Sequence, residues 1–135
     1  MNIIYNETAG IFKLDTAHTS YLIGLTDDEG FIGHVYYGET ISDSDAGYLM
    51  RTGEPPFVPS KNSRDRSSFF DAFPMEFPGC NTGDYRESAI EVLDGGGNNG
   101  VEIVYKDHRI YAGKPTLNGL PATFGVSGDC MTLEI

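Results

Sequence analysis

The sequence predicts an all-β domain, a β-sandwich with a long irregular central loop. Short stretches in which apolar and polar residues alternate, such as Tyr21, Ile23 and Leu25 with their neighbours, are typical of half-buried strands. The 17 glycines and 7 prolines separate these stretches, as turn residues do. No window keeps apolar residues at i, i+3, i+4 and i+7 for three turns, so long amphipathic helices are not expected. The chain is therefore expected to form two packed β-layers.

Three strands are expected in the amino-terminal third. Phe12 and Leu14 alternate with polar neighbours, residues 21–25 do the same, and residues 31–37 are rich in aromatic and β-branched side chains. Asp27-Asp28-Glu29-Gly30 lies between the last two stretches, which predicts a hairpin.

Further strands are expected in the carboxyl-terminal half. Residues 90–93 and 101–105 flank a glycine-rich turn, and a strand is expected to extend to Tyr111. Pro115, Asn118-Gly119 and Pro121 mark another loop. The alternation in residues 131–135 predicts a last strand, and the apolar end at Ile135 suggests that a further strand or domain would follow.

The central segment, residues 41–80, shows little alternation and contains five of the seven prolines. Loops of this length in compact domains are usually functional when they are ordered. The segment also carries five phenylalanines that would be costly to leave in water: Phe57, Phe69, Phe70, Phe73 and Phe77. We therefore expect it to dock, either on its own sandwich or on another subunit.

Composition narrows the class of partner. A net charge of −11 without a Lys/Arg cluster argues against nucleic acid and anionic membranes. No apolar run approaches the roughly 18 residues of a membrane span. The start of the chain does not resemble a secretory signal. The two cysteines, Cys80 and Cys130, are therefore expected to be reduced thiols of a cytoplasmic protein, and residues 1–135 to form one domain.

Several motifs resemble cofactor or metal sites without fulfilling their requirements. Residues 95–100 satisfy G-x-G-x-x-G, but a strand rather than a helix is expected to follow, which favours a hairpin turn over a dinucleotide site. Asp43, Asp45 and Glu54 have calcium-loop spacing, but Tyr48 stands where that loop needs glycine. The three histidines are too far apart for a zinc site. No cofactor and no metal are expected.

Three carboxylates near aromatic residues could suggest a glycosidase pair, namely Asp71, Glu76 and Asp84. Twenty acidic residues make such neighbours common by chance. Loop caps and ion pairs with Arg66 or Arg86 are the simpler interpretation. No catalytic residue is assigned in this chain.

Several motifs, in order along nearly the whole chain, resemble those of glycoside hydrolase family 36, the bacterial α-galactosidases. They are Phe12-Lys13-Leu14 with Thr19-Ser20-Tyr21-Leu22, Gly33 to Gly38, Met75-Glu76-Phe77-Pro78, Gly83-Asp84-Tyr85-Arg86, His108 to Pro115 running into Gly119 to Thr123, and Thr132 to Ile135. The resemblance implies a β-supersandwich that precedes a (β/α)8 barrel. The barrel would carry two aspartates, the nucleophile and the acid/base of a retaining mechanism. The fragment alone should be inactive.

The resemblance also implies a task for the central segment. In tetrameric family members this loop reaches a neighbouring subunit's sugar pocket, and the matching residues here are Glu54, Phe57 and Arg66. A carboxylate and a guanidinium can hydrogen-bond sugar hydroxyls, while an aromatic face stacks on a C–H surface. Family members often have Asp at the position of Glu54, so the contact of its longer side chain is not fixed. The alternative is a solvated loop with an internal ion pair of Arg66.

The leading hypothesis is thus a non-catalytic domain of an α-galactosidase that acts on raffinose-type and melibiose-type galactosides. It would cover the barrel, support homo-oligomerisation and contribute the loop to a galactoside site. The alternatives are a stand-alone carbohydrate-binding module and a pure oligomerisation domain. Two further motifs are interpreted structurally. Gly83 to Arg86 is expected to be a turn with an internal Asp–Arg pair, and His108 and Lys114 are expected to pack against the loop or the barrel.

Overall fold

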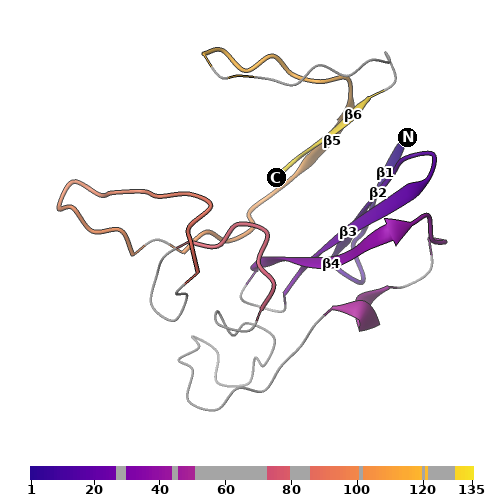
Figure 1. The fold of residues 1–135 in the computed structure, drawn as a ribbon, viewed down its shortest axis with the longest axis horizontal. Coiled ribbons are helices and arrows are strands. Elements are labelled where there is room, and N and C mark those ends of the chain that lie inside the picture. Colours follow the sequence, from indigo (N-terminus) through magenta and orange to yellow (C-terminus); the bar gives the residue numbers. More distant parts are fainter. Residues whose placement is uncertain are drawn as a thin grey trace.

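The computed structural model describes residues 1–26, 30–43, 46–50, 73–79, 86–100, 102–119, 121 and 130–135. These residues contain six strands and one 3₁₀ turn (Figure 1). The strands are β1 (Asn2–Asn6), β2 (Ile11–Asp15), β3 (Thr19–Leu25), β4 (Ile32–Glu39), β5 (Arg109–Ala112) and β6 (Met131–Glu134), and the 3₁₀ turn is η1 (Gly47–Leu49).

The first four strands form one antiparallel sheet in the order β1-β2-β3-β4. The predicted hairpin between β3 and β4 is confirmed, with Leu25 opposite Ile32 and the amide of Thr26 bonded to the carbonyl of Phe31 at 2.8 Å. Strand β1 was not predicted, because the adjacent Ile3 and Ile4 obscure the alternation.

The register divides the sheet into two faces. Side chains that are opposite or two residues apart share a face, so Tyr5, Phe12, Leu14, Tyr21 and Ile23 lie together on what we call the inner face. Leu22 and Ile11 point to the other, outer face, where they form a core with Ala46 beside η1.

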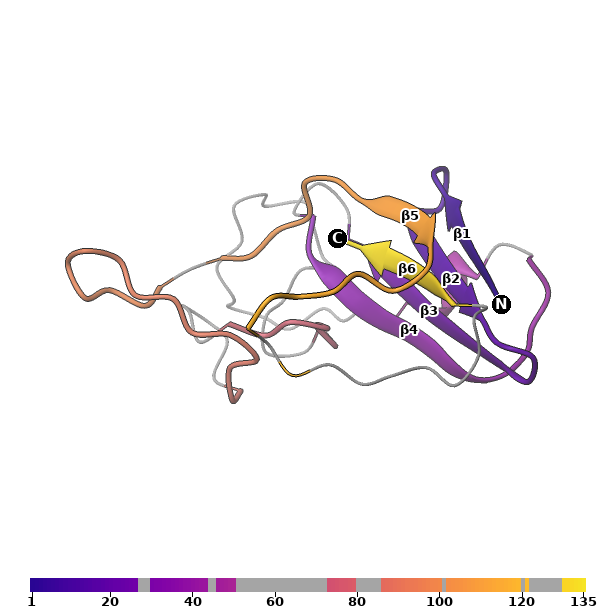
Figure 2. The same ribbon diagram turned by 90° about the horizontal axis from the view of Figure 1, so that it is seen from above.

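The second layer is the β5–β6 hairpin, which lies over the inner face (Figure 2). Strand β6 of this hairpin contacts strand β1 of the sheet. His108, directly before β5, packs on Phe12 with ring centroids 4.8 Å apart and on Tyr5 at 4.5 Å. Among the described residues the partners of His108 are the rings of Tyr5 and Phe12 and the hydroxyl of Tyr105. Its expected packing against the loop or the barrel stays a prediction. The all-β sandwich-like architecture is confirmed.

Two expected strands are absent from the described residues. Residues 90–93 and 102–105 do not form a ladder, although the glycine-rich turn between them is present. The Asp94 carboxylate caps this turn by accepting the amides of Gly96 and Asn98 at 2.8 and 2.9 Å. An isolated two-stranded ribbon is marginally stable at best, and Leu93 is 70% exposed, so little packing would support a ladder.

A charged pair is buried in the outer face. The ammonium group of Lys13 donates to the carboxylates of Asp15 and Asp43, at 2.5 and 2.7 Å, and its side chain is only 9% exposed. Burial by itself raises the pKa of Asp15, but the hydrogen bonds from Lys13 and Ser20 outweigh it and hold that pKa below its usual value. The carboxylate of Asp43, the first residue of the calcium-like spacing, therefore accepts a hydrogen bond from the ammonium group of Lys13.

This pair predicts an acid-sensitive stability. A carboxyl group whose pKa is lower in the folded state stabilises the fold above its unfolded pKa of about 3.9, and the contribution is lost as pH falls through the folded value. The free energy of unfolding should therefore decrease when the pH is lowered below about 4. Urea denaturation at a series of pH values from neutral to acid measures this dependence. The free energy of unfolding should fall less steeply with pH in Asp15→Asn than in the unchanged chain. An identical slope in the variant would contradict the assignment.

Among the described residues no helix is long and apolar enough to cross a membrane. Cys130 is a free, half-buried thiol, and Cys80 lies outside the described residues.

Candidate functional site

The three residues predicted to reach a sugar pocket, Glu54, Phe57 and Arg66, lie outside the described residues. The same is true of Asp71 and Asp84. The structure does describe the two flanks of the segment that carries the loop residues, which end at Met50 and begin again at Phe73. We call the contacts of these two flanks the loop base. They fix the two points of the sheet to which the ends of this segment are joined.

The two flanks meet on one spot of the outer face. Gly24 and Gly33 are paired across β3 and β4, and this spot has no side chains of its own. A Cβ atom at Gly24 would run into the end of Met50, and one at Gly33 would run into the ring of Phe73. Phe73 and Phe31 are both 2% exposed and form one cluster, against which Met50 packs. The glycine pair thus seats both ends of the segment.

The returning flank also adds main-chain hydrogen bonds to β4. Met75 forms an antiparallel bridge with Gly33. The amide of His34 donates to the carbonyl of Pro74 at 2.8 Å, and the amide of Glu76 donates to the carbonyl of Ile32 at 2.9 Å. These bonds extend the sheet at its β4 edge and hold the return point in register.

Arg86 links this flank to the chain beyond it. Its guanidinium donates to the carbonyl of Phe73 at 2.6 Å. The expected pair between Asp84 and Arg86 cannot be traced, because Asp84 lies outside the described residues. The arginine of the Gly-Asp-Tyr-Arg motif therefore contributes to the loop base.

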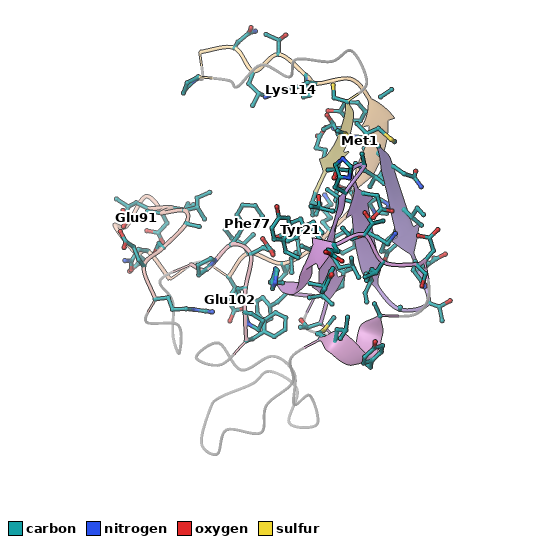
Figure 3. The ribbon with its side chains drawn as sticks, turned by 45° about the vertical axis from the view of Figure 1, so that its right-hand side comes forward. Met1, Tyr21, Phe77, Glu91, Glu102 and Lys114 are labelled. Carbon is teal, nitrogen blue, oxygen red and sulfur yellow. The ribbon has the colours of Figure 1, made fainter. Side chains whose placement is uncertain are left out.

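Glu76 joins the loop base to the inner face. The hydroxyl of Tyr21, which is labelled in Figure 3, donates to its carboxylate. Nδ1 of His34 lies 3.6 Å from the same carboxylate. Burial, followed by the hydrogen bond and the negative charge of Glu76, raises the pKa of Tyr21 far above its ordinary value. The ring of Tyr37 meets Tyr21 edge to face at 6.0 Å. Loop caps or ion pairs with Arg66 or Arg86 were expected for Asp71, Glu76 and Asp84 as a group. In the described residues the partners of Glu76 are Tyr21 and His34.

The phenylalanines of the central segment do not behave alike. Phe73 is buried in the loop base, as docking of this segment on its own sandwich predicts. Phe77 is 54% exposed, so it does not dock on the sandwich, and its docking on another subunit stays a prediction. The other three lie outside the described residues.

Sequence reasoning missed the glycine pair, although its signal is present. Gly24 and Gly33 become cross-strand neighbours once the hairpin is registered. Two glycines facing each other in a sheet indicate a close approach by another segment.

The loop base gives a sharp mutational prediction. Gly33→Ala should lower the free energy of unfolding by about 1–3 kcal/mol, because the added methyl group overlaps the Phe73 ring in a packed cluster. Gly100→Ala is the matched control, since a methyl group added there would meet no atom within 4 Å beyond its chain neighbours. Chemical denaturation measures both. Adding Phe73→Leu to Gly33→Ala should recover part of the lost free energy. Equal losses for Gly33→Ala and Gly100→Ala would contradict the packing of Phe73 on Gly33.

A cleft lies between the inner face and β6. Its volume is about 410 Å³, and Leu14, Tyr21, Tyr37 and Met131 are among the side chains that line it. Asp15, Thr16 and Thr19 line it as well.

In the described residues no three His, Cys, Asp or Glu side chains gather as they would around a metal ion.

Comparisons with known proteins agree on one family. The sequence model described as the Glycosyl hydrolase family 36 N-terminal domain matches residues 30–135. The bifunctional alpha-galactosidase/sucrose kinase AgaSK of Mediterraneibacter gnavus is 37% identical over 137 residues, which cover 100% of this chain and 14% of that protein. Alpha-galactosidase AgaA of Geobacillus stearothermophilus is 34% identical over 124 residues, 92% of this chain and 17% of that protein.

Solved structures give the same result. The galactosidase domain of AgaSK superposes with a TM-score of 0.83 at 36% identity, over 98% of this chain and 18% of that one. The chain thus spans less than a fifth of the length of these relatives.

Proposed function

Because the chain belongs to the family of glycosyl hydrolase family 36 N-terminal domains, we propose that it is the non-catalytic amino-terminal domain of an α-galactosidase. The parent enzyme hydrolyses terminal α-galactosides of the raffinose and melibiose type. The observation that carries the proposal is the match of residues 30–135 to this family, together with relatives that are α-galactosidases at 34–37% identity.

The catalytic residues belong to the remainder of the parent enzyme. Matching parts make up only 14–17% of these relatives. A retaining glycosidase needs two carboxyl groups about 5–5.5 Å apart on either side of the glycosidic bond. In this proposal a (β/α)8 barrel downstream supplies them, residues 1–135 form one domain that covers the barrel, and the enzyme is cytoplasmic.

The central segment completes the sugar pocket of a neighbouring subunit in a homo-oligomer. Glu54 and Arg66 hydrogen-bond the galactoside hydroxyls, and Phe57 stacks on the sugar ring. The loop base supports this role, because a segment whose two ends are seated on one glycine pair is fixed to the sheet at a single place. The hydrogen bond that Arg86 donates and those along β4 add further contacts at that place.

A domain exchange tests the assignment. The chain replaces the matching domain of the M. gnavus α-galactosidase, which is 37% identical to it. The chimera should hydrolyse an aryl α-galactoside, and the 135-residue chain alone should show no turnover. Turnover by the isolated chain, or a folded chimera without activity, would defeat the proposal.

Calorimetry separates the proposal from the carbohydrate-binding alternative. A stand-alone binding module would take up galactosides as an isolated chain. The proposed domain requires the barrel of a neighbouring subunit and should give no heat of binding.

A further inference from the structure

An arm of the chain extends away from the strands of both layers (Figure 1). We define the arm as residues 88–100, in which every residue from Ala89 to Gly100 is exposed. Its tip is the glycine-rich turn that the Asp94 carboxylate caps. Behind the tip, Asn99 and Gly100 belong to no strand and no turn. The peptide bond between these two residues is therefore open to solvent.

An asparagine followed by glycine can react with its own main chain. The amide nitrogen of the glycine attacks the side-chain carbonyl carbon, the C–N bond of the side-chain amide breaks, and ammonia leaves with the proton of the glycine amide. The product is a succinimide ring, which water opens again. Opening at the side-chain carbonyl gives aspartate, and opening at the main-chain carbonyl gives isoaspartate. Glycine favours ring closure because it has no Cβ atom to hinder the attack and its main chain rotates freely.

Three pairs of neighbouring residues in the sequence can form such a ring. Two are the Asn-Gly pairs Asn99-Gly100 and Asn118-Gly119, and the third is Asp94-Gly95, from which water rather than ammonia would leave. The structure distinguishes the three pairs, because ring closure requires a free side-chain carbonyl group and a main chain that can rotate toward it.

The carboxylate of Asp94 is held in place by its neighbours. It accepts hydrogen bonds from the main-chain amides of Gly96 and Asn98 and, at 2.8 Å, from the side-chain amide of Asn98. These hydrogen bonds, first among them the one from the Asn98 side chain, keep the pKa of Asp94 below its ordinary value. A carboxyl group that stays ionised has no OH group to lose as water, so the Asp94-Gly95 pair resists ring closure.

The two asparagines differ in their main chain. Asn118 lies in a turn with Gly119, whose φ of 78° is left-handed. This turn has to open before the glycine nitrogen can reach the side chain. Asn99 has no such restraint, and in the described part of the chain neither its side chain nor the amide of Gly100 has a hydrogen-bond partner. A Cβ atom at Gly100 would meet no atom within 4 Å beyond its chain neighbours, so the ring has room to form.

We propose that Asn99 is a site of spontaneous deamidation, at which water converts the side chain through a succinimide to isoaspartate and aspartate before Asn118 or Asp94 reacts. The product adds a negative charge to a chain whose net charge is already −11. Asn99 lines a small hollow with Ile90 and Ile103, and a carboxylate beside these apolar side chains costs more than a neutral amide. Deamidation should therefore loosen the arm. This inference does not depend on the proposed function, because it concerns only the chemistry of the arm.

Peptide mapping of the folded 135-residue chain tests the proposal. The chain is kept at mildly alkaline pH, where the glycine amide loses its proton more readily, and samples are digested with trypsin over time. Cleavage after Arg86, Lys106 and Arg109 places Asn99 and Asn118 in separate peptides. Mass spectrometry measures the gain in mass when an OH group replaces the NH2 group. This gain should appear about fivefold faster or more in the peptide of Asn99, since Asn118 must first leave its turn.

Gly100→Ala tests the role of the glycine. The added methyl group hinders the attack but meets no atom within 4 Å beyond its chain neighbours, so the reaction should slow by about tenfold or more while the fold is kept. Labelling of this peptide by an isoaspartate methyltransferase should disappear as well. An unchanged rate would overturn the proposal. Label that persists in the variant would also overturn it, because it would mean that Asp94 reacts.

Urea separates the effect of the fold from the effect of the sequence. In the unfolded chain both asparagines precede a glycine without any turn, so Asn99 and Asn118 should react at similar rates. Equal rates in the folded chain, or a faster reaction of Asn118 there, would contradict the proposal. The same difference between the two rates in urea as in the folded chain would contradict it too.

Discussion

Phe12→Ala should lower the free energy of unfolding by about 3–5 kcal/mol, the usual cost of removing a buried aromatic ring. Phe12 is fully buried, and its ring stacks on Tyr5 at 4.3 Å and meets His108 edge to face at 4.8 Å. It is one of the points at which the two layers touch. Domains of this size are stable by only about 5–15 kcal/mol, so a loss of this size is a large share of the total. Urea denaturation followed by far-ultraviolet circular dichroism measures it.

Phe77→Ala is the matched control for this experiment. It removes the same ring from a site that is 54% exposed, and the cost should be clearly smaller. Phe12→Leu keeps most of the buried volume and should fall between the two. If Phe12→Ala and Phe77→Ala cost the same, the hairpin does not pack on the sheet in the way described.

The strands that could be predicted from the sequence are those whose periodicity and turn chemistry agree. Residues 21–25 and the aromatic and β-branched residues 31–37 lie on either side of an Asp/Gly turn, and they became β3 and β4. Residues 90–93 are also apolar and next to a turn but form no ladder, because a strand needs a partner and a packed face as well as a pattern. Strand β1 shows the reverse case, since pairing with β2 makes it a strand despite an irregular pattern.

The site was less predictable than the fold, because it depends on contacts that are distant in sequence. Glu76 was recognised as part of a motif, yet its partner Tyr21 lies 55 residues away and follows only from the bridge between Gly33 and Met75. In the folded chain, the flank that carries Glu76 runs along β4 and brings its carboxylate to Tyr21.

Arg66→Ala in the chimera should lower kcat/KM for a galactoside by about ten- to a hundredfold. A hydrogen bond from a charged group contributes about 1.5–3 kcal/mol, and 1.4 kcal/mol corresponds to a factor of ten. If Arg66 binds the substrate equally strongly in the ground state and in the transition state, the loss appears as a raised KM. A lowered kcat means that the contact strengthens in the transition state. Steady-state kinetics with raffinose and with an aryl α-galactoside give both constants.

Arg64→Ala is the matched control, since it removes the same charge two residues away on the same segment. A purely electrostatic effect of the segment would change both variants alike, and a role limited to assembly would alter the oligomer rather than the kinetics. Light scattering on both variants therefore accompanies the assays. A specific loss at Arg66 in an intact oligomer would assign the guanidinium to the pocket. Unchanged kinetics in an intact oligomer would instead mean that the segment never reaches the sugar, which is the behaviour of a pure oligomerisation domain.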